Sequence, residues 1–172
     1  SEPTAVAIGR SAEGEPYLLT RWAEGRVYAE DLRRIVADGV DGADLARCRL
    51  LATWLAELHA DRLDAPEVYR RAVRDLVGGS EGIFGIVDGY PDGTPAAPAA
   101  RLRAIETQCA EWRWRLRGKE RRLARIHGDF HPFNILHDDD GHLVLVDASR
   151  GCAGDPADDA AALAINYLFF AA

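Results

Sequence analysis

Three side chains with oxygen atoms, two carboxylates and one amide, lie close together in the sequence in the last third of the chain. Asp129 and Asn134 are separated by four residues, and Asp147 directly follows the apolar run Leu143–Val146. Phosphoryl transfer needs few protein groups. One carboxylate orients the attacking hydroxyl and accepts its proton, and hard oxygen ligands hold Mg²⁺ on the nucleotide phosphates. Asp129 suits the first role, and Asn134 and Asp147 suit the second.

A strand–turn–strand unit would hold these side chains in place. The sequence predicts a strand over Asn134–His137, a hairpin turn over Asp138–Gly141 and a buried strand over Leu143–Val146. Pairing of the two strands would bring Asn134 and Asp147 side by side. Pro132 lacks an N–H group and has a fixed φ, so the preceding loop is expected to stay outside regular structure.

With these residues in order, His127–Asp159 resembles the catalytic core of the aminoglycoside phosphotransferase family, small-molecule kinases with a protein-kinase-like fold. The resemblance implies that Asp129 is the catalytic base and that Asn134 and Asp147 bind magnesium. The run Gly154–Asp159 is similar to the G-D-P-x-x-D stretch that follows in many members. Asp147 is followed by alanine and serine, a departure from the D-F-G of protein kinases that weakens only the protein-kinase interpretation.

The same resemblance gives roles to residues around these three. His127, Asp155 and Asp159 are expected to support the catalytic loop rather than to do chemistry. Near the start of the chain, Tyr17–Gly25 resembles the family's hinge, which implies that the carbonyl of Arg21 and the N–H of Ala23 bind the nucleotide base. The alternative for this segment is an edge hairpin that binds no ligand.

The expected fold class is α+β and protein-kinase-like, with a mainly helical C-terminal lobe that carries the catalytic hairpin. Residues 1–22 would be a β-hairpin at the end of the N-terminal lobe together with the hinge, and residues 23–172 the helical lobe, truncated at its C-terminus. The chain has no methionine, a single lysine, Lys119, and no G-x-G-x-x-G loop. We therefore expect most of the N-terminal lobe to lie outside this sequence and the piece alone to be inactive.

Between hinge and catalytic loop the periodicity predicts helices. The clearest runs from Asp44 to Ala60, and its apolar stripe is expected to form the central buried face of the lobe: Leu45, Cys48, Leu51, Ala52, Leu55 and Leu58. Trp54 lies off this stripe. The glycine-rich apolar segment Ser80–Pro91 is predicted to be a packed loop in preference to a lid over substrate.

Composition narrows the class of protein. A length of 172 residues suits one sizeable core, and the net charge of −7 argues against nucleic acid as a partner. The three cysteines, Cys48, Cys109 and Cys152, form no metal-binding or disulfide pattern, which favours a reducing, cytoplasmic compartment. No signal peptide or transmembrane run is visible, so no membrane partner is expected.

Two alternatives use the same residues. In an extended strand, His127, Asp129 and His131 would share one face and, with His137 or Asp147, could bind zinc in a metal-dependent hydrolase. A kinase-like binding module without catalysis is the other alternative. The preferred hypothesis is ATP- and Mg²⁺-dependent transfer of the γ-phosphoryl group to a small-molecule hydroxyl. Aminoglycosides are one candidate acceptor among amino sugars, amino alcohols and other metabolites; the acceptor, ATP against GTP, and the oligomeric state are left open by the sequence.

Overall fold

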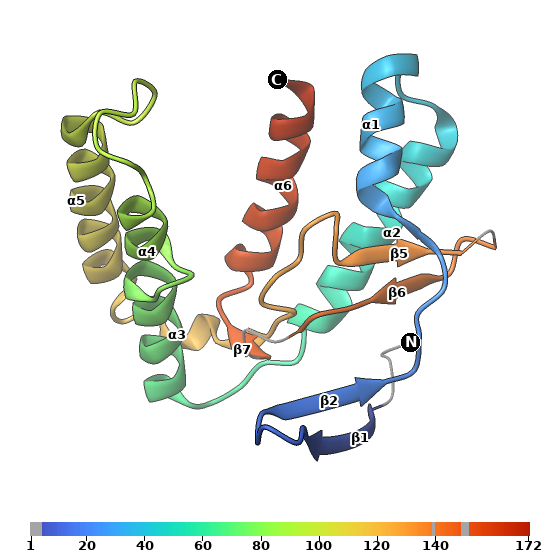
Figure 1. The fold of residues 1–172 in the computed structure, drawn as a ribbon, viewed down its shortest axis with the longest axis horizontal. Coiled ribbons are helices and arrows are strands. Elements are labelled where there is room, and N and C mark those ends of the chain that lie inside the picture. Colours follow the sequence, from blue (N-terminus) through green and yellow to red (C-terminus); the bar gives the residue numbers. More distant parts are fainter. Residues whose placement is uncertain (1–4, 139, 149–151) are drawn as a thin grey trace. The chain divides into compact units, whose positions relative to one another are not determined.

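The computed structural model describes residues 5–138, 140–148 and 152–172 (Figure 1). Runs of short antiparallel strands come before and after a run of helices, and a last helix ends the described chain, which is compatible with the expected α+β class. In chain order the elements are β1 (Ala5–Arg10), β2 (Pro16–Thr20), β3 (Arg26–Val27), α1 (Tyr28–Asp38), α2 (Gly42–His59), α3 (Pro66–Gly78), α4 (Ile83–Asp88), α5 (Ala99–Leu116), the 3₁₀ turn η1 (Glu120–Arg122), β4 (Ala124–Arg125), β5 (Ile135–His137), β6 (Leu143–Leu145), β7 (Ala153–Gly154) and α6 (Ala157–Ala171).

The chain forms two compact units. The first contains Ser1–Ala56, His127–Cys152 and Ala157–Ala172, and the second contains Glu57–Ile126 and Ala153–Pro156. The first unit therefore holds the whole of the catalytic loop and hairpin predicted from the sequence. The lobe boundary expected at residue 22 stays a prediction.

The strand–turn–strand prediction is confirmed in the first unit. Strands β5 and β6 lie side by side and are antiparallel (Figure 1), with Ile135 opposite Leu145 and His137 opposite Leu143. Strand β3 pairs with the other edge of β5. The turn is closed by the N–H of Gly141, whose φ of 82° favours glycine, donating to the carbonyl of Asp138. Asp139 in this predicted turn lies outside the described residues.

One hydrophobic core lies beneath the catalytic loop. It joins the first two helices, the loop, β5 and α6 through Tyr28, Leu32, Leu51, Leu55, Phe130, Ile135 and Leu163. Phe130 is fully buried, and the indole of Trp54 stacks on its ring at 5.4 Å with the two planes 4° apart. Phe130, which directly follows Asp129 in the sequence, therefore anchors the loop to the hydrophobic core.

The stripe predicted on α2 is partly wrong. Leu51 and Leu55 are buried as expected, but the side chain of Leu45 is 50% exposed, and Cys48 is also exposed. The buried face is rotated toward Asp44, which is itself buried. Polar contacts explain the rotation: Asp44 pairs with Arg34 of α1, so this edge of α2 must face α1 rather than solvent.

In the second unit α3, α4 and α5 pack against one another, and Tyr69 and Val73 of α3 form a smaller core with Leu123. Helix α4 corrects the prediction of a packed loop at Ser80–Pro91. Gly85 does not break this helix. It lets the backbone of Ser80 come close, because a Cβ on Gly85 would lie 2.0 Å from the carbonyl oxygen of Ser80. In the second unit, β4 and β7 form a short antiparallel pair.

The N-terminal hairpin is confirmed. Strands β1 and β2 are antiparallel, with Arg10 opposite Pro16, and the N–H of Ser11 donates to the carbonyl of Glu15 at 2.8 Å across the turn. Helix α1 is capped at its C-terminus by Gly39, whose N–H donates to the carbonyl of Ile35. None of the helices in the described ranges has the length and apolar character that crossing a membrane would require.

Candidate active site

The loop between β4 and β5 is shaped by successive tight turns. The N–H of His131 donates to the carbonyl of Asp129 at 3.0 Å, and the N–H of Asn134 donates to the carbonyl of His131 at 2.9 Å. Gly128, with a φ of 84°, supplies the left-handed residue that starts the first turn. Pro132 is buried and its carbonyl accepts from the N–H of Ala29 at 3.2 Å, which fixes the loop against the start of α1.

Asp159, in the first turn of α6, holds the entry to this loop. Its carboxylate accepts hydrogen bonds from the backbone N–H groups of His127, at 2.9 Å, and Gly128, at 2.8 Å. The side chain is completely buried. Hydrogen bonds to an ionised carboxylate are stronger than neutral ones, and burial strengthens them further. The loop and α6 therefore form one connected piece of structure, although they are about 30 residues apart.

Asp129 and Asn134 are brought into direct contact. The Nδ2 group of Asn134 donates to the carbonyl oxygen of Asp129 at 3.0 Å and to its Oδ2 atom at 3.2 Å. This use of the amide nitrogen leaves Oδ1 of Asn134 as the atom with lone pairs to offer a cation. The side chain of Asn134 is buried, and that of Asp129 is 17% exposed, so both are held while Asp129 keeps access to solvent.

Asp147 lies at the same end of the hairpin. The N–H of Val146 donates to the carbonyl of Asn134 at 3.0 Å. Asp147 is the next residue after Val146, so its backbone lies close to that of Asn134. Asp147 has a φ of 59°, the one left-handed residue other than glycine in the described part of the chain. Aspartate tolerates this region better than most residues, and such strain concentrates at functional sites. Asp147 is exposed at the end of this strand.

His127 has the surroundings of a structural residue. Its Nδ1 atom accepts from the N–H of Asp129 at 3.3 Å, and its ring packs edge-on against Phe130 at 5.7 Å. Burial lowers the pKa of His127 below its usual value, against the opposing pull of the carboxylates of Asp159 and Asp129. The ring is therefore neutral in the folded protein at neutral pH and supports the loop through packing and hydrogen bonding.

His131 connects Asp129 with the exposed edge of the loop. Its Nε2 atom is 3.4 Å from Oδ2 of Asp129, and its Nδ1 atom accepts from the N–H of Phe133 at 3.2 Å. The imidazole ring is 5.9 Å from the ring of Phe133. His131, expected from the sequence only as a possible zinc ligand, is therefore a neighbour of the Asp129 carboxylate.

The residues of the zinc alternative do not gather. Within residues 5–138, 140–148 and 152–172, one group of acidic, histidine or cysteine side chains has its ligand atoms within 4.8 Å of one another, namely Asp138, Asp140 and His142. This group lies in the hairpin turn between β5 and β6 and is largely exposed. His127, Asp129 and His131 do not form such a group, which removes the geometric basis for a hydrolase.

The remaining predicted residues are Arg21 and Ala23, which precede β3, and Asp155, which belongs to the second unit. Arg21 and Ala23 are in the irregular segment between β2 and β3, and no hydrogen bond or ion pair within the described residues joins them to the catalytic loop. Asp155 belongs to the second unit, where it accepts from the Tyr69 hydroxyl at 2.8 Å and from two nitrogens of Arg122 at 2.7 Å. Burial and the Asp155 carboxylate raise the pKa of Tyr69 to about 12, so this hydroxyl stays a donor.

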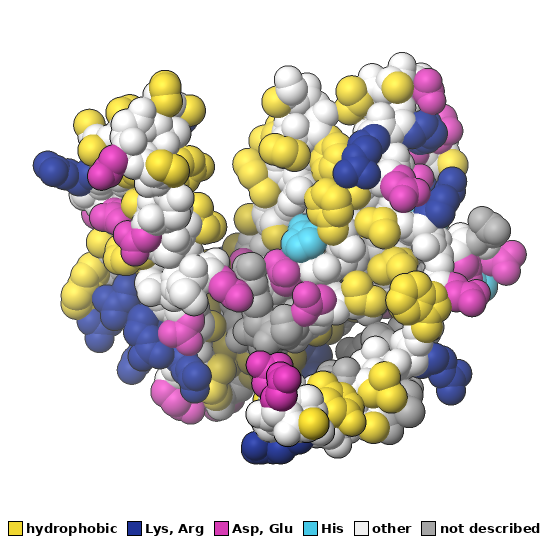
Figure 2. Space-filling view, viewed as in Figure 1, with side chains coloured by type: hydrophobic (Ala, Val, Ile, Leu, Met, Phe, Trp, Pro, Cys, Tyr) yellow, Lys and Arg dark blue, Asp and Glu magenta, His cyan; other side chains and the backbone are white. Residues whose placement is uncertain are grey.

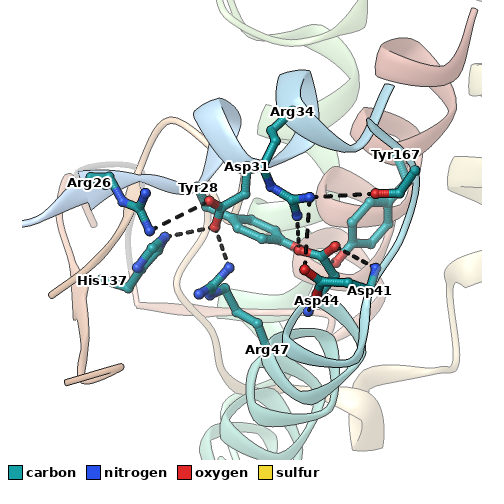
Figure 3. Close-up of polar contacts among 10 residues, drawn as sticks. Arg26, Tyr28, Asp31, Arg34, Asp41, Asp44, Arg47, His137 and Tyr167 are labelled. Atoms are coloured by element: carbon teal, nitrogen blue, oxygen red, sulfur yellow. Dashed lines mark hydrogen bonds and ion pairs between the residues drawn. The ribbon is translucent and has the colours of Figure 1, made fainter. Parts of the chain in front are cut away.

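A buried polar cluster that the sequence analysis missed supports the far end of β5. Nε2 of His137 lies 2.7 Å from Oδ2 of Asp31, and Arg47 of α2 binds the same carboxylate (Figure 3). His137 is 1% exposed and Asp31 5% exposed. The sequence did contain a signal for this cluster. Asp31 lies on the same face of α1 as the apolar Tyr28 and Leu32, and a charged residue on a buried face needs a partner.

Comparison of the sequence with known protein families identifies the family of this chain. The family model described as the phosphotransferase enzyme family (APH) matches residues 1–172. This match confirms the resemblance seen in His127–Asp159 and extends it over the rest of the sequence. No curated protein matches the chain significantly.

The hydrogen bonds of Asp159 can be tested by removing its charge. Because each charge-assisted bond contributes on the order of 1.5–3 kcal/mol, we expect Asp159→Asn to lower the free energy of unfolding by about 2–4 kcal/mol. Glu30→Gln is the control, since it removes the same charge from an exposed position in the first turn of α1, in the same unit, and should cost less than about 1 kcal/mol. Urea unfolding of the full-length protein measures both. Equal losses for the two variants would show that the charge at the helix terminus, and not the loop contact, matters.

The neutral state of His127 predicts a pH dependence of stability. Its pKa is lower in the folded than in the unfolded protein, so the unfolded chain binds the proton first as the pH falls below about 6.5. Stability should therefore decrease between pH 7 and pH 5. The decrease should be smaller in His127→Gln, which has no such proton to gain. The unfolding free energies of the two proteins at both pH values provide the measurement, and parallel curves would contradict the assignment.

Proposed function

Because the chain belongs to the phosphotransferase enzyme family, we propose that it transfers the γ-phosphoryl group of ATP to a hydroxyl group of a small molecule. The observation that carries this proposal is the contact between Asn134 and Asp129. The amide nitrogen holds the Asp129 carboxylate, which leaves the amide oxygen as a possible cation ligand, and Asp147 follows β6, the strand that pairs with β5. One carboxylate is thereby separated from a pair of cation ligands, the division of roles that phosphoryl transfer needs.

The residues present fit a magnesium ion. Mg²⁺ prefers hard oxygen ligands, and Oδ1 of Asn134 and the carboxylate of Asp147 are oxygen atoms of this kind. The strained backbone of Asp147 supports this assignment, because Asp147 is exposed and directly follows Val146, whose N–H bonds the carbonyl of Asn134. A bound magnesium ion would neutralise charge on the nucleotide phosphates.

Asp129 would act on the acceptor. Its carboxylate is partly exposed, is anchored by Asn134 and stands beside the ring of His131. In this position it can accept a hydrogen bond from the acceptor hydroxyl, orient one oxygen lone pair toward the phosphoryl group and take up the proton as the new P–O bond forms. The fixed loop supplies the orientation, which contributes strongly to the rate when the reacting atoms are held in line.

Nucleotide binding would involve the segment before β3. We propose, from the family resemblance, that the carbonyl of Arg21 and the N–H of Ala23 bond the adenine base. The pairing of Arg26 and Val27 in β3 with His137 and Leu136 in β5 supports a link between this segment and the hairpin. Backbone groups of this kind read the edge of the base, and ATP rather than GTP is our choice for the donor.

A kinase-like module that binds ligands without catalysis is the second candidate. It would use the same nucleotide and acceptor contacts, so it differs only in turnover. The specific observation against it is that the carboxylate of Asp129 is positioned with a supporting amide and partial exposure, an arrangement that binding alone does not require.

The proposal predicts a loss of turnover in Asp129→Ala. Removing a general base costs roughly 10²–10⁴-fold in kcat, and we expect this loss without a comparable change in affinity for Mg²⁺ and ATP. Phosphoryl transfer by the full-length protein to a panel of amino sugars, amino alcohols and hydroxy acids provides the measurement. Asp140→Ala, in the exposed hairpin turn, is the control and should retain activity.

Two results would contradict the proposal. Transfer by Asp129→Ala at the rate of the unchanged protein would remove Asp129 from the mechanism. Binding of Mg²⁺ and ATP with no transfer to any acceptor in the panel would favour the binding module.

A further inference from the structure

An arginine lies over two aromatic rings, one from the catalytic loop and one from α6. The guanidinium carbon of Arg33, on α1, lies 5.8 Å from the ring centre of Phe133 and 5.9 Å from that of Phe170. The two rings are themselves 6.2 Å apart. Figure 2 shows hydrophobic side chains gathered over α1 and α6 around an exposed histidine. We call Arg33, Phe133 and Phe170 the arginine–aromatic patch.

Arg33 differs from the other arginines of this region in its charge environment. Arg34 is paired with Asp44, and Arg47 with Asp31 (Figure 3). Within the described residues Arg33 forms no ion pair and no hydrogen bond, and it makes none with Glu30 one turn earlier. Its positive charge is therefore not compensated by a carboxylate of the described chain.

A stacked guanidinium keeps its hydrogen-bonding edge available. Contact with aromatic rings uses the flat face of the group, while its N–H groups point outward in the plane. That edge matches a carboxylate with two parallel hydrogen bonds. The ring of Phe133 is 47% exposed beside it, which offers contact to an apolar or aromatic group.

The patch is continuous with the carboxylate that would receive the hydroxyl. Phe133 is 5.9 Å from the ring of His131, and His131 is 3.4 Å from Oδ2 of Asp129. A molecule lying along these side chains would meet Asp129 first, then the two rings, and then Arg33. One unpaired arginine matches a single negative charge, and the nearby Asp129 and Asp147 disfavour a more highly charged anion.

We propose that the acceptor is an alcohol with an apolar or aromatic body and one carboxylate, bound with its hydroxyl at Asp129 and its carboxylate on the guanidinium of Arg33. The inference rests on the proposed function, because it takes Asp129 as the group that receives the hydroxyl. It disfavours polycationic amino sugars, since an ammonium group in the same position would meet a like charge.

Three benzyl alcohols that differ only in the para substituent test this preference. They are 4-(hydroxymethyl)benzoate, 4-(hydroxymethyl)benzamide and 4-(hydroxymethyl)benzylamine, with carboxylate, neutral and ammonium groups. Their binding to the full-length protein, saturated with Mg²⁺ and a non-hydrolysable ATP analogue, is measured by calorimetry. Because a charge-assisted hydrogen bond corresponds to roughly tenfold or more in affinity, the benzoate should bind at least about tenfold more tightly than the benzylamine.

Substitutions of Arg33 assign the preference to one side chain. Arg33→Ala should weaken the benzoate about tenfold and leave the benzamide within about twofold. Arg33→Lys should recover only part of the affinity, because lysine keeps the charge and loses the flat, forked geometry. Arg49→Ala removes an exposed arginine of α2 and is the matched control, with no effect on the three affinities expected.

The outcomes separate this inference from the function on which it rests. Benzoate binding that is absent, that is no tighter than benzylamine binding, or that is unchanged in Arg33→Ala overturns the inference. If the protein then still phosphorylates another hydroxyl in an Asp129-dependent reaction, the proposed function stands alone. Benzoate binding that depends on Arg33 without any phosphoryl transfer would leave the carboxylate site in place and remove the proposed function.

Discussion

The structure of the site depends on one buried carboxylate, that of Asp159. A loop that turns twice within eight residues leaves backbone N–H groups without partners in a helix or strand, and burying them unpaired would be costly. Asp159 accepts from two of them at the start of the loop. Because Phe130 is buried beneath the same loop, the backbone is fixed from two directions. Asp129 and Asn134 can then meet without the support of a regular element.

A second constraint sets the position of the hairpin. Strand β5 carries Asn134 at its entry and His137 at its end, and the pairing of His137 with Asp31 holds that end against α1. The ion pairs from α2 to α1 have a similar effect on α2, whose buried face is rotated so that Asp44 can reach Arg34. Polar contacts between helices thus position a site whose own residues lie in loops.

The sequence predicted the features that depend on local order. The spacing of Asp129, Asn134 and Asp147, the turn ending in Gly141 and the strands on either side involve fewer than twenty consecutive residues. Features that depend on distant partners were missed, such as the Asp31–His137 pair and the rotation of α2. The helix at Ile83–Asp88 was missed because glycine there indicated a loop, whereas Gly85 provides close approach to Ser80. The stacking of Arg33 on Phe133 likewise joins segments 100 residues apart.

The most direct test of the account is the position of the metal. Crystals of the full-length protein with Mn²⁺ in place of Mg²⁺ and a non-hydrolysable ATP analogue would reveal the ion by its anomalous scattering. The account predicts one peak bonded to Oδ1 of Asn134 and to the carboxylate of Asp147, at about 2.0–2.2 Å, with Asp129 outside the coordination shell. A nucleotide complex with the metal on Asp129 and not on Asn134, or only at Asp138, Asp140 and His142, would contradict it.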